Sequence, residues 1–187
     1  MKRVHWSKSW FNVAHEVSQR SLCEGAQVGT VITDKNNRIV ATGYNGPPRG
    51  FDHGGKSCSH WCQRQRARDS EPLVGYGLSC PSIHSEANAL MFADRRAYEG
   101  GSMYVTATCC EDCAKLVSNS GIKTLYLKIG EKDLNRGACN PIEFLIQCGI
   151  DVVLSPTFDT PLDNDEWERV LNISDKYDGK LSVLFDE

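Results

Sequence analysis

The sequence predicts an α/β protein with parallel strand pairing in its sheet. A strand at 103–107, a helix at 111–119 and a strand at 123–129 follow one another closely. Such a strand–helix–strand unit places its two strands parallel in one sheet. Upstream, β-rich segments at 27–33 and 38–44 flank the turn sequence Asp-Lys-Asn-Asn and predict a hairpin. The chain has 187 residues, of which 40% are hydrophobic, and so can bury a sizeable core.

The N-terminal segment is predicted to form an amphipathic helix over 6–20, because apolar residues recur on one helical face. These are Trp6, Trp10, Val13, Ala14 and Val17. After the hairpin, residues 46–81 are rich in Gly, Pro, Ser and Cys and predict a long irregular insert. Inserts of this length are usually functional or held by a metal. We expect one domain over residues 1–187 that contains this insert.

The next helix is predicted over 84–98. Ser82 precedes it as a candidate cap, and the pair Gly100-Gly101 ends it.

The C-terminal third continues the alternation of helices and strands. Asn140 and Pro141 suit the N-cap and first position of a helix, which a strand at 151–154 follows. A last helix is predicted over 163–175. The tail at 181–185 is either an edge strand or an ordered arm.

The charge and hydropathy of the sequence limit the classes of binding partner to expect. The formal net charge of −3 gives no basic footprint for nucleic acid. A short basic run, Arg64, Arg66 and Arg68, is interpreted as a solvated loop. No apolar stretch approaches the ~20 residues of a membrane span, and residues 1–6 lack the apolar core of a signal peptide. We therefore expect a cytoplasmic protein with no nucleic-acid or membrane partner.

The cysteine content indicates a reducing compartment. Nine cysteines are many for this length, their number is odd, and no export signal precedes them. A disulfide framework is therefore disfavoured, and metal-bound thiols are favoured.

The strongest chemical signal is His84-x-Glu86 followed by Cys110-x-x-Cys113. One imidazole and two thiolates are ligands that zinc prefers, and three ligands leave a tetrahedral ion with one open, catalytic position. A Cys-x-x-Cys at a helix N-terminus places both sulfurs on one side of the first turn, where the helix dipole favours thiolates. A redox pair would not explain the histidine and glutamate, and a structural zinc knuckle would need a fourth protein ligand.

Glu86 lies two residues from the histidine and is placed to handle protons. It would take a proton from a zinc-activated water and return it to a ring nitrogen and a leaving amine. This pattern of residues is the known signature of the zinc-dependent nucleobase deaminases.

Further stretches identify a family. Residues 27–32, 43–48, 84–89 and 103–106 running into 110–115 resemble the cytidine deaminase superfamily, most closely its deoxycytidylate (dCMP) deaminases of phages and bacteria. The resemblance runs from about residue 10 to about residue 170 and implies a three-layer αβα fold with a central five-stranded mixed sheet. It also implies hydrolysis of dCMP to dUMP and ammonia, which supplies dUMP for dTMP synthesis. It further implies a homohexamer, activation by dCTP with Mg²⁺ and inhibition by dTTP; a viral relative would act in the host cytoplasm.

Two residues depart from the family pattern. Cys109 stands where the family has Pro, and Ser85 where it has Ala. Adjacent side chains of an extended segment point apart, so the register with Cys113 favours Cys110 over Cys109 as the ligand. In the family the backbone N–H at position 85 holds the pyrimidine carbonyl, and Ser preserves that group.

The resemblance also implies a substrate pocket. Asn45 would bind the sugar, and Val28 and Tyr126 would flank the base. The alternative for Val28 and Tyr126 is ordinary core packing, and for Asn45 an ordinary Asn-Gly turn.

An effector site is implied at Tyr44, Asn45, Gly46, Phe92 and Arg95. The alternative for the last two is a core phenylalanine and a surface arginine.

A second, structural zinc is a further expectation from the resemblance. Cys23 and Cys80 match family positions, and His53 and Cys58 are the first choices from the insert. The alternative is buried free thiols.

Two other activities remain open. A tRNA adenosine deaminase would share the metal site but would need a basic surface, and a deaminase of this family can also act on dCTP. A catalytically silent zinc protein that senses dCTP and dTTP is a third alternative.

Overall fold

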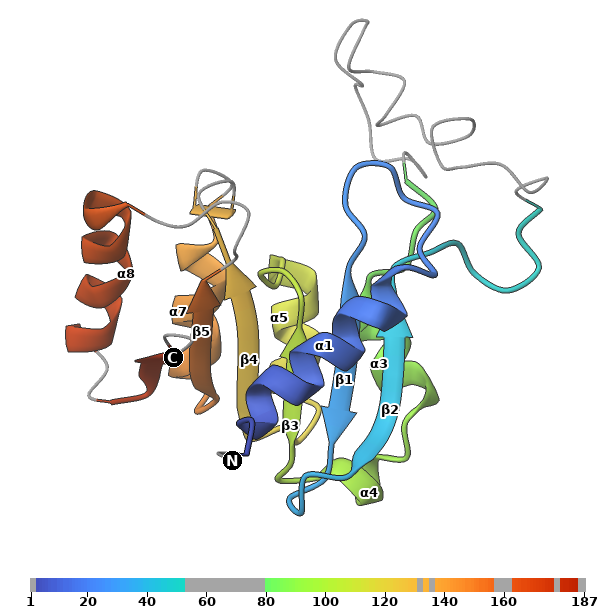
Figure 1. The fold of residues 1–187 in the computed structure, drawn as a ribbon, viewed down its shortest axis with the longest axis horizontal. Helices are drawn as coiled ribbons and strands as arrows, with labels where there is room; N and C mark the ends of the chain where they lie inside the picture. Colours follow the sequence, from blue (N-terminus) through green and yellow to red (C-terminus); the bar gives the residue numbers. More distant parts are fainter. Residues whose placement is uncertain are drawn as a thin grey trace, which may run out of the picture.

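The computed structural model describes residues 3–52, 80–130, 133–134, 137–156, 163–176 and 179–184. They form a six-stranded mixed sheet with the strand order β2-β1-β3-β4-β5-β6 (Figure 1). The strands are β1 (Gly29–Thr33), β2 (Ile39–Tyr44), β3 (Ser102–Val105), β4 (Thr124–Ile129), β5 (Asp151–Pro156) and β6 (Leu181–Val183). The basic run and two insert residues predicted as zinc ligands, His53 and Cys58, lie outside the described residues.

Strand pairing confirms both predicted units. β1 is antiparallel to β2 and to β3, whereas β3, β4, β5 and β6 run parallel to one another. The expected count of five strands is wrong by one, because the tail adds β6 beside β5. Leu181 is paired with Val152 and buried, so the tail contributes to the core as an edge strand.

Helices cover both faces of the sheet and make three layers, as expected. α1 (Trp6–Ser18) packs Phe11 and Ala14 on one face, against Val31 and Tyr104. On the opposite face lie α3 (Ser85–Phe92), α5 (Glu111–Ser118) and α7 (Cys139–Gln147) (Figure 1). α8 (Asn164–Lys176) lies beside α7 and β6. None of the helices in these described ranges is long and apolar enough to cross a membrane.

The predicted helix over 84–98 is instead two helices, α3 and the short α4 (Arg95–Tyr98). Ala93 adopts an extended conformation, and the side chain of Asp94 accepts a hydrogen bond from the backbone N–H of Arg96. This local cap stops one helix and begins the next. The predicted cap at Ser82 is also wrong, because His84 occupies the N-cap position. α7 likewise begins at Cys139, with Ala138 rather than Asn140 as its N-cap residue.

Several chain segments meet at one edge of the sheet. β3, β4 and β5 end there, β1 begins there, and β2 ends there because Gly29 is paired with Tyr44. A two-way backbone bridge between Gly46 and Ile83 ties the end of β2 to the start of α3. Ligand sites of open α/β sheets favour this edge.

Candidate active site

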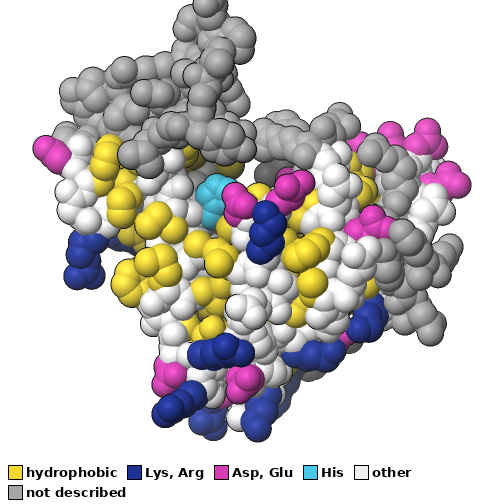
Figure 2. Space-filling view, turned by 180° about the vertical axis from the view of Figure 1, so that it is seen from behind, with side chains coloured by type: hydrophobic (Ala, Val, Ile, Leu, Met, Phe, Trp, Pro, Cys, Tyr) yellow, Lys and Arg dark blue, Asp and Glu magenta, His cyan; other side chains and the backbone are white. Residues whose placement is uncertain are grey.

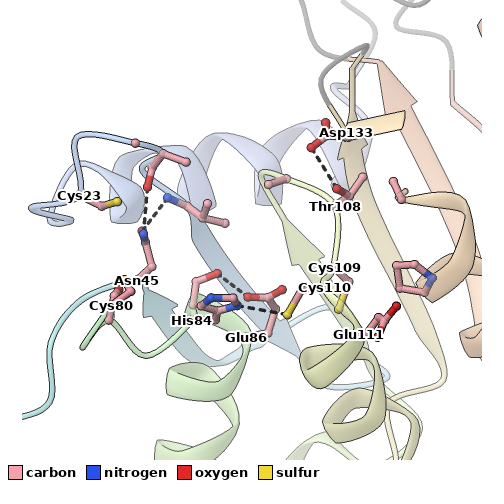
Figure 3. Close-up of a pocket in the computed structure, with 18 of the residues that line it drawn as sticks. Cys23, Asn45, Cys80, His84, Glu86, Thr108, Cys109, Cys110, Glu111 and Asp133 are labelled. Atoms are coloured by element: carbon pink, nitrogen blue, oxygen red, sulfur yellow. Dashed lines mark hydrogen bonds between the residues drawn. The ribbon is translucent and has the colours of Figure 1, made fainter. Parts of the chain in front are cut away.

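Three side chains that could ligate a metal, His84, Cys110 and Cys113, lie where the N-termini of α3 and α5 approach each other. Figure 3 shows two of them, His84 and Cys110. His84 precedes α3, Cys110 is the N-cap of α5, and Cys113 lies in the first turn of α5. The His84 Nδ1 atom is 3.3 Å from Cys110 Sγ and 3.5 Å from Cys113 Sγ. All three atoms lie within 4.8 Å of one another.

This geometry fits a zinc ion. Tetrahedral bonds of about 2.1 Å to nitrogen and 2.3 Å to sulfur imply nitrogen–sulfur separations of about 3.6 Å. The observed separations of 3.3 Å and 3.5 Å match them without movement of either helix. With three protein ligands, one coordination position would stay open to the cavity, as catalytic zinc sites require.

The structure also favours Cys110 over its neighbour Cys109 as the sulfur beside His84. A hydrogen bond from the Cys113 thiol, together with the contact to His84, lowers the pKa of Cys110 to about 4. The pKa of Cys109 is raised: its contact with Cys113 opposes the shift, but burial and the charge of Glu86 outweigh it. Contacts with the Cys109 and Cys110 sulfurs, and then burial, raise the pKa of the Cys113 thiol.

Glu86 lies beside the three ligands, in the first turn of α3, with only 3% of its surface exposed. Burial raises the pKa of Glu86, while its own backbone N–H and the charge of His84 oppose the shift. A carboxyl group whose pKa is raised is suited to accept and return a proton.

The site opens into a cavity of about 630 Å³, a size typical of small-molecule sites. In the described part of the chain it is lined by Cys23, Gly25, Ala26, Val28, Asn45, Cys80, Ser82, His84, Ser85, Glu86, Ala107, Thr108, Cys109, Cys110, Glu111, Asp133, Gly137, Ala138 and Pro141. These lining residues include three carboxyl groups, Glu86, Glu111 and Asp133, but neither lysine nor arginine.

Asn45 and Val28, predicted to bind the sugar and to flank the base, both line the cavity. The side chain of Asn45 accepts a hydrogen bond from the Val28 N–H at 2.8 Å and donates one to the Ala26 carbonyl at 2.9 Å. Its amide therefore fixes the loop before β1 and keeps one N–H for a ligand.

Tyr126, predicted to flank the base, does not line this cavity. Its ring stacks on Tyr104 at 4.3 Å, on the face of the sheet that α1 covers. Leu125 and Leu127 point to the opposite face because side chains alternate along β4. Core packing, the alternative reading, therefore describes Tyr126.

The residues predicted for an effector site form two groups. Tyr44, Asn45 and Gly46 follow one another at the end of β2, whereas Phe92 and Arg95 lie at and after the end of α3. Tyr44 accepts a hydrogen bond at its carbonyl from Asn88 of α3, and the Arg20 guanidinium lies 5.9 Å from its ring centre. Phe92 ends α3 with 72% of its surface exposed, and Arg95 pairs with Glu99 at 3.9 Å.

Of the residues predicted for a second zinc, Cys23 and Cys80 both line the cavity (Figure 3). Within the described ranges, His84, Cys110 and Cys113 form the one cluster of three potential metal ligands.

Three residues that the sequence did not single out belong to this region. Thr108 donates a hydrogen bond to Asp133 at 3.0 Å, and Asp133 also accepts one from the Gly130 N–H at 2.9 Å. Thr30 reaches the site from β1, where every residue is buried and no alternation marks an inward face.

Comparisons with known proteins agree with this geometry. Residues 4–129 match the family model described as the cytidine and deoxycytidylate deaminase zinc-binding region. The deoxycytidylate deaminase of Enterobacteria phage T4 is 34% identical over 190 residues, covering 84% of this chain and 93% of that protein. The deoxycytidylate deaminase of Mycobacterium phage D29 is 36% identical over 126 residues, covering 66% of this chain and 94% of its own.

A solved structure shares the fold. The apo crystal structure of dCMP deaminase from the cyanophage S-TIM5 has a TM-score of 0.59 and 24% identity, covering 82% of this chain and 99% of that chain. The family match spans two thirds of the chain and includes both halves of the metal cluster. The chain therefore belongs to the zinc-binding family of cytidine and deoxycytidylate deaminases.

Proposed function

We propose that the protein hydrolyses dCMP to dUMP and ammonia, with zinc held by His84, Cys110 and Cys113 and with Glu86 as the proton carrier. The observation that carries this proposal is the buried carboxyl group of Glu86 beside three ligand atoms that lie within 4.8 Å of one another. The phage relatives named deoxycytidylate deaminase support the choice of substrate. The cyanophage enzyme that shares the fold has a crystal structure in complex with dCMP and dUMP.

A zinc ion held by His84, Cys110 and Cys113 would activate a water at neutral pH. Glu86 would take a proton from this water and deliver it to N3 of the cytosine ring, while the remaining hydroxide adds to C4. Glu86 would then move the proton of the new C4 hydroxyl to the amine, so that ammonia leaves and a carbonyl forms at C4. The water contributes the new oxygen, and Glu86 returns to its starting state.

Binding groups surround this proton carrier. The backbone N–H of Ser85 is the first of α3 and has no partner within the helix, so it can donate to the pyrimidine carbonyl. Asn45 keeps one N–H for a sugar hydroxyl, and Val28 supplies an apolar wall for the base.

Regulation and assembly are further parts of the proposal, supported by the family. We expect a cytoplasmic homohexamer that dCTP with Mg²⁺ activates and dTTP inhibits, through Tyr44, Asn45, Gly46, Phe92 and Arg95. A structural zinc is proposed at Cys23 and Cys80 with His53 and Cys58. Exposed hydrophobic side chains on the face of the molecule that carries α3 and α5 support assembly (Figure 2). Met91, Phe92 and Leu116 are 67%, 72% and 50% exposed.

A substrate panel tests the proposal. The zinc-loaded protein is incubated with dCMP, dCDP, dCTP, deoxycytidine and tRNA, each with and without dCTP and dTTP, and uracil product, inosine and ammonia are measured. We expect dCMP to give the highest kcat/KM. The described lining offers no lysine or arginine. The ratio of kcat/KM for dCMP to kcat/KM for deoxycytidine therefore measures what the phosphate contributes to substrate recognition. Inosine in tRNA without dUMP from dCMP would favour the tRNA deaminase, and no product from any substrate would favour a silent nucleotide sensor.

A further inference from the structure

Two buried hydroxyl groups form a chain that ends on the carboxyl group of Glu86. Thr30 Oγ1 donates to Ser85 Oγ at 2.8 Å, and Ser85 Oγ donates to Glu86 Oε2 at 3.0 Å. Thr30 and Ser85 have no exposed surface, and Glu86 has 3%. Neither hydroxyl is therefore exposed to bulk water in the folded protein.

The direction of these hydrogen bonds follows from the last group in the series, the carboxyl group of Glu86. In the ionised state, from which Glu86 accepts a proton, its carboxyl group can only accept hydrogen bonds, so Ser85 donates to it. The Ser85 oxygen is then free to accept from Thr30, and hydrogen bonds aligned in this way strengthen one another.

The chain of hydrogen bonds begins on an interior strand of the sheet. Thr30 lies in β1, which pairs with β2 on one side and with β3 on the other, where Thr30 faces Val105. Ser85 is the first residue of α3, so the two hydroxyls connect the centre of the sheet to the helix that carries the carboxyl group.

We infer that Ser85 is a positioning residue that, held by Thr30, orients the Glu86 carboxyl group for proton transfer. Glutamate has three rotatable side-chain bonds, and a fixed donor on one oxygen selects a single orientation of the group. The inference rests on the proposed function, since it concerns the step that Glu86 performs there. A hydroxyl that acts only on the fold would change stability and leave the rate of the folded enzyme unaltered.

The variants are Ser85→Ala, Thr30→Val, Thr30→Ser and the double variant Ser85→Ala/Thr30→Val. The matched control is Thr33→Val, which removes an equally buried hydroxyl from the same strand; Thr33 Oγ1 donates to the Ser102 carbonyl at 3.5 Å and does not contact Glu86. Single-turnover rates of dCMP deamination, KM, zinc per chain and denaturant unfolding are measured for each.

We expect Ser85→Ala to lower the single-turnover rate about 10-fold, with KM changed less than about twofold, as for the loss of a hydrogen bond to a charged group. Thr30→Val should lower it about threefold, and Thr30→Ser should restore most of the rate because its hydroxyl remains. The double variant should be no slower than Ser85→Ala alone, because Thr30 acts through Ser85. Thr33→Val should lose stability but keep its rate.

Other results would overturn the inference. An unchanged rate in Ser85→Ala shows that the hydroxyl only satisfies Thr30, and multiplicative effects in the double variant show that the two residues act separately. A wild-type protein that does not convert dCMP refutes the proposed function instead, whatever the variants do.

Discussion

Gly43 allows α3 to lie directly against β2, and replacing it with Ala should displace the catalytic helix. A Cβ atom at this position would stand 2.3 Å from the Ser85 carbonyl oxygen and 2.6 Å from the Ala89 nitrogen. Both are backbone atoms of α3, so no side-chain rotation can relieve the overlap. The helix must withdraw from the sheet by roughly 1 Å to reach an ordinary contact distance.

Two consequences of different size follow for Gly43→Ala. Overpacking of this kind lowers the free energy of unfolding by about 1–3 kcal/mol. The same shift carries Glu86, together with His84, away from Cys110 and Cys113 of α5, and a misplacement of about 1 Å at a reacting group costs about 100-fold in rate. We therefore expect kcat/KM for dCMP to fall about 100-fold in folded, zinc-loaded protein.

Gly101→Ala is the control for destabilisation alone. Its Cβ atom would stand 2.0 Å from the Thr33 carbonyl oxygen, at the opposite end of the sheet from the metal ligands. Urea unfolding and kcat/KM are measured for both variants. We expect similar losses of stability but, for Gly101→Ala, a rate within about threefold of wild type. If Gly43→Ala loses stability and keeps its rate, the position of α3 does not set the geometry of the site.

Three further predictions concern single side chains. Cys110→Ser should lose bound zinc and activity, whereas Cys109→Ser should keep about one equivalent at the site, as metal analysis of purified protein would show; equal loss in both would reject the assignment of the ligand. Asn45→Ala removes the bonds to the loop before β1 and should lower the free energy of unfolding by about 1–3 kcal/mol and raise KM, whereas a change in stability alone would exclude a substrate contact. Leu181→Ala should cost about 2–4 kcal/mol in denaturant unfolding if β6 belongs to the core, with the exposed Ser182→Ala near wild type; equal, small effects would remove β6 from the core.

The candidate metal ligands could be predicted from sequence because local structure places them. Cys110 and Cys113 share the first turn of one helix, and His84 and Glu86 flank the start of another. The Gly100-Gly101 stop and the close strand–helix–strand unit predicted these two helical segments and the parallel pairing of β3 with β4. Only the approach of the two helix ends required the tertiary fold.

Other features depend on contacts that no local pattern carries. Thr30 and Ser85 are 55 residues apart, and neither spacing nor charge marks their hydrogen bond. Tyr126 alternates with buried leucines along β4, so the sequence does not show which face of the sheet its ring occupies. The pairing of β4 with β3 and the packing of α1 place the ring on the face that α1 covers. The break at Ala93 depends on a side-chain cap at Asp94 that a continuous helical pattern concealed.

Replacing Glu86 with Gln tests the central claim most directly, because it removes the proton-accepting group and keeps its size. The formation of dUMP and ammonia from dCMP is measured for this variant and for wild type at equal zinc content. We predict that Glu86→Gln binds zinc as wild type does and that its rate falls by about 10²–10⁴-fold. A zinc-loaded variant that deaminates dCMP at the wild-type rate would contradict the account.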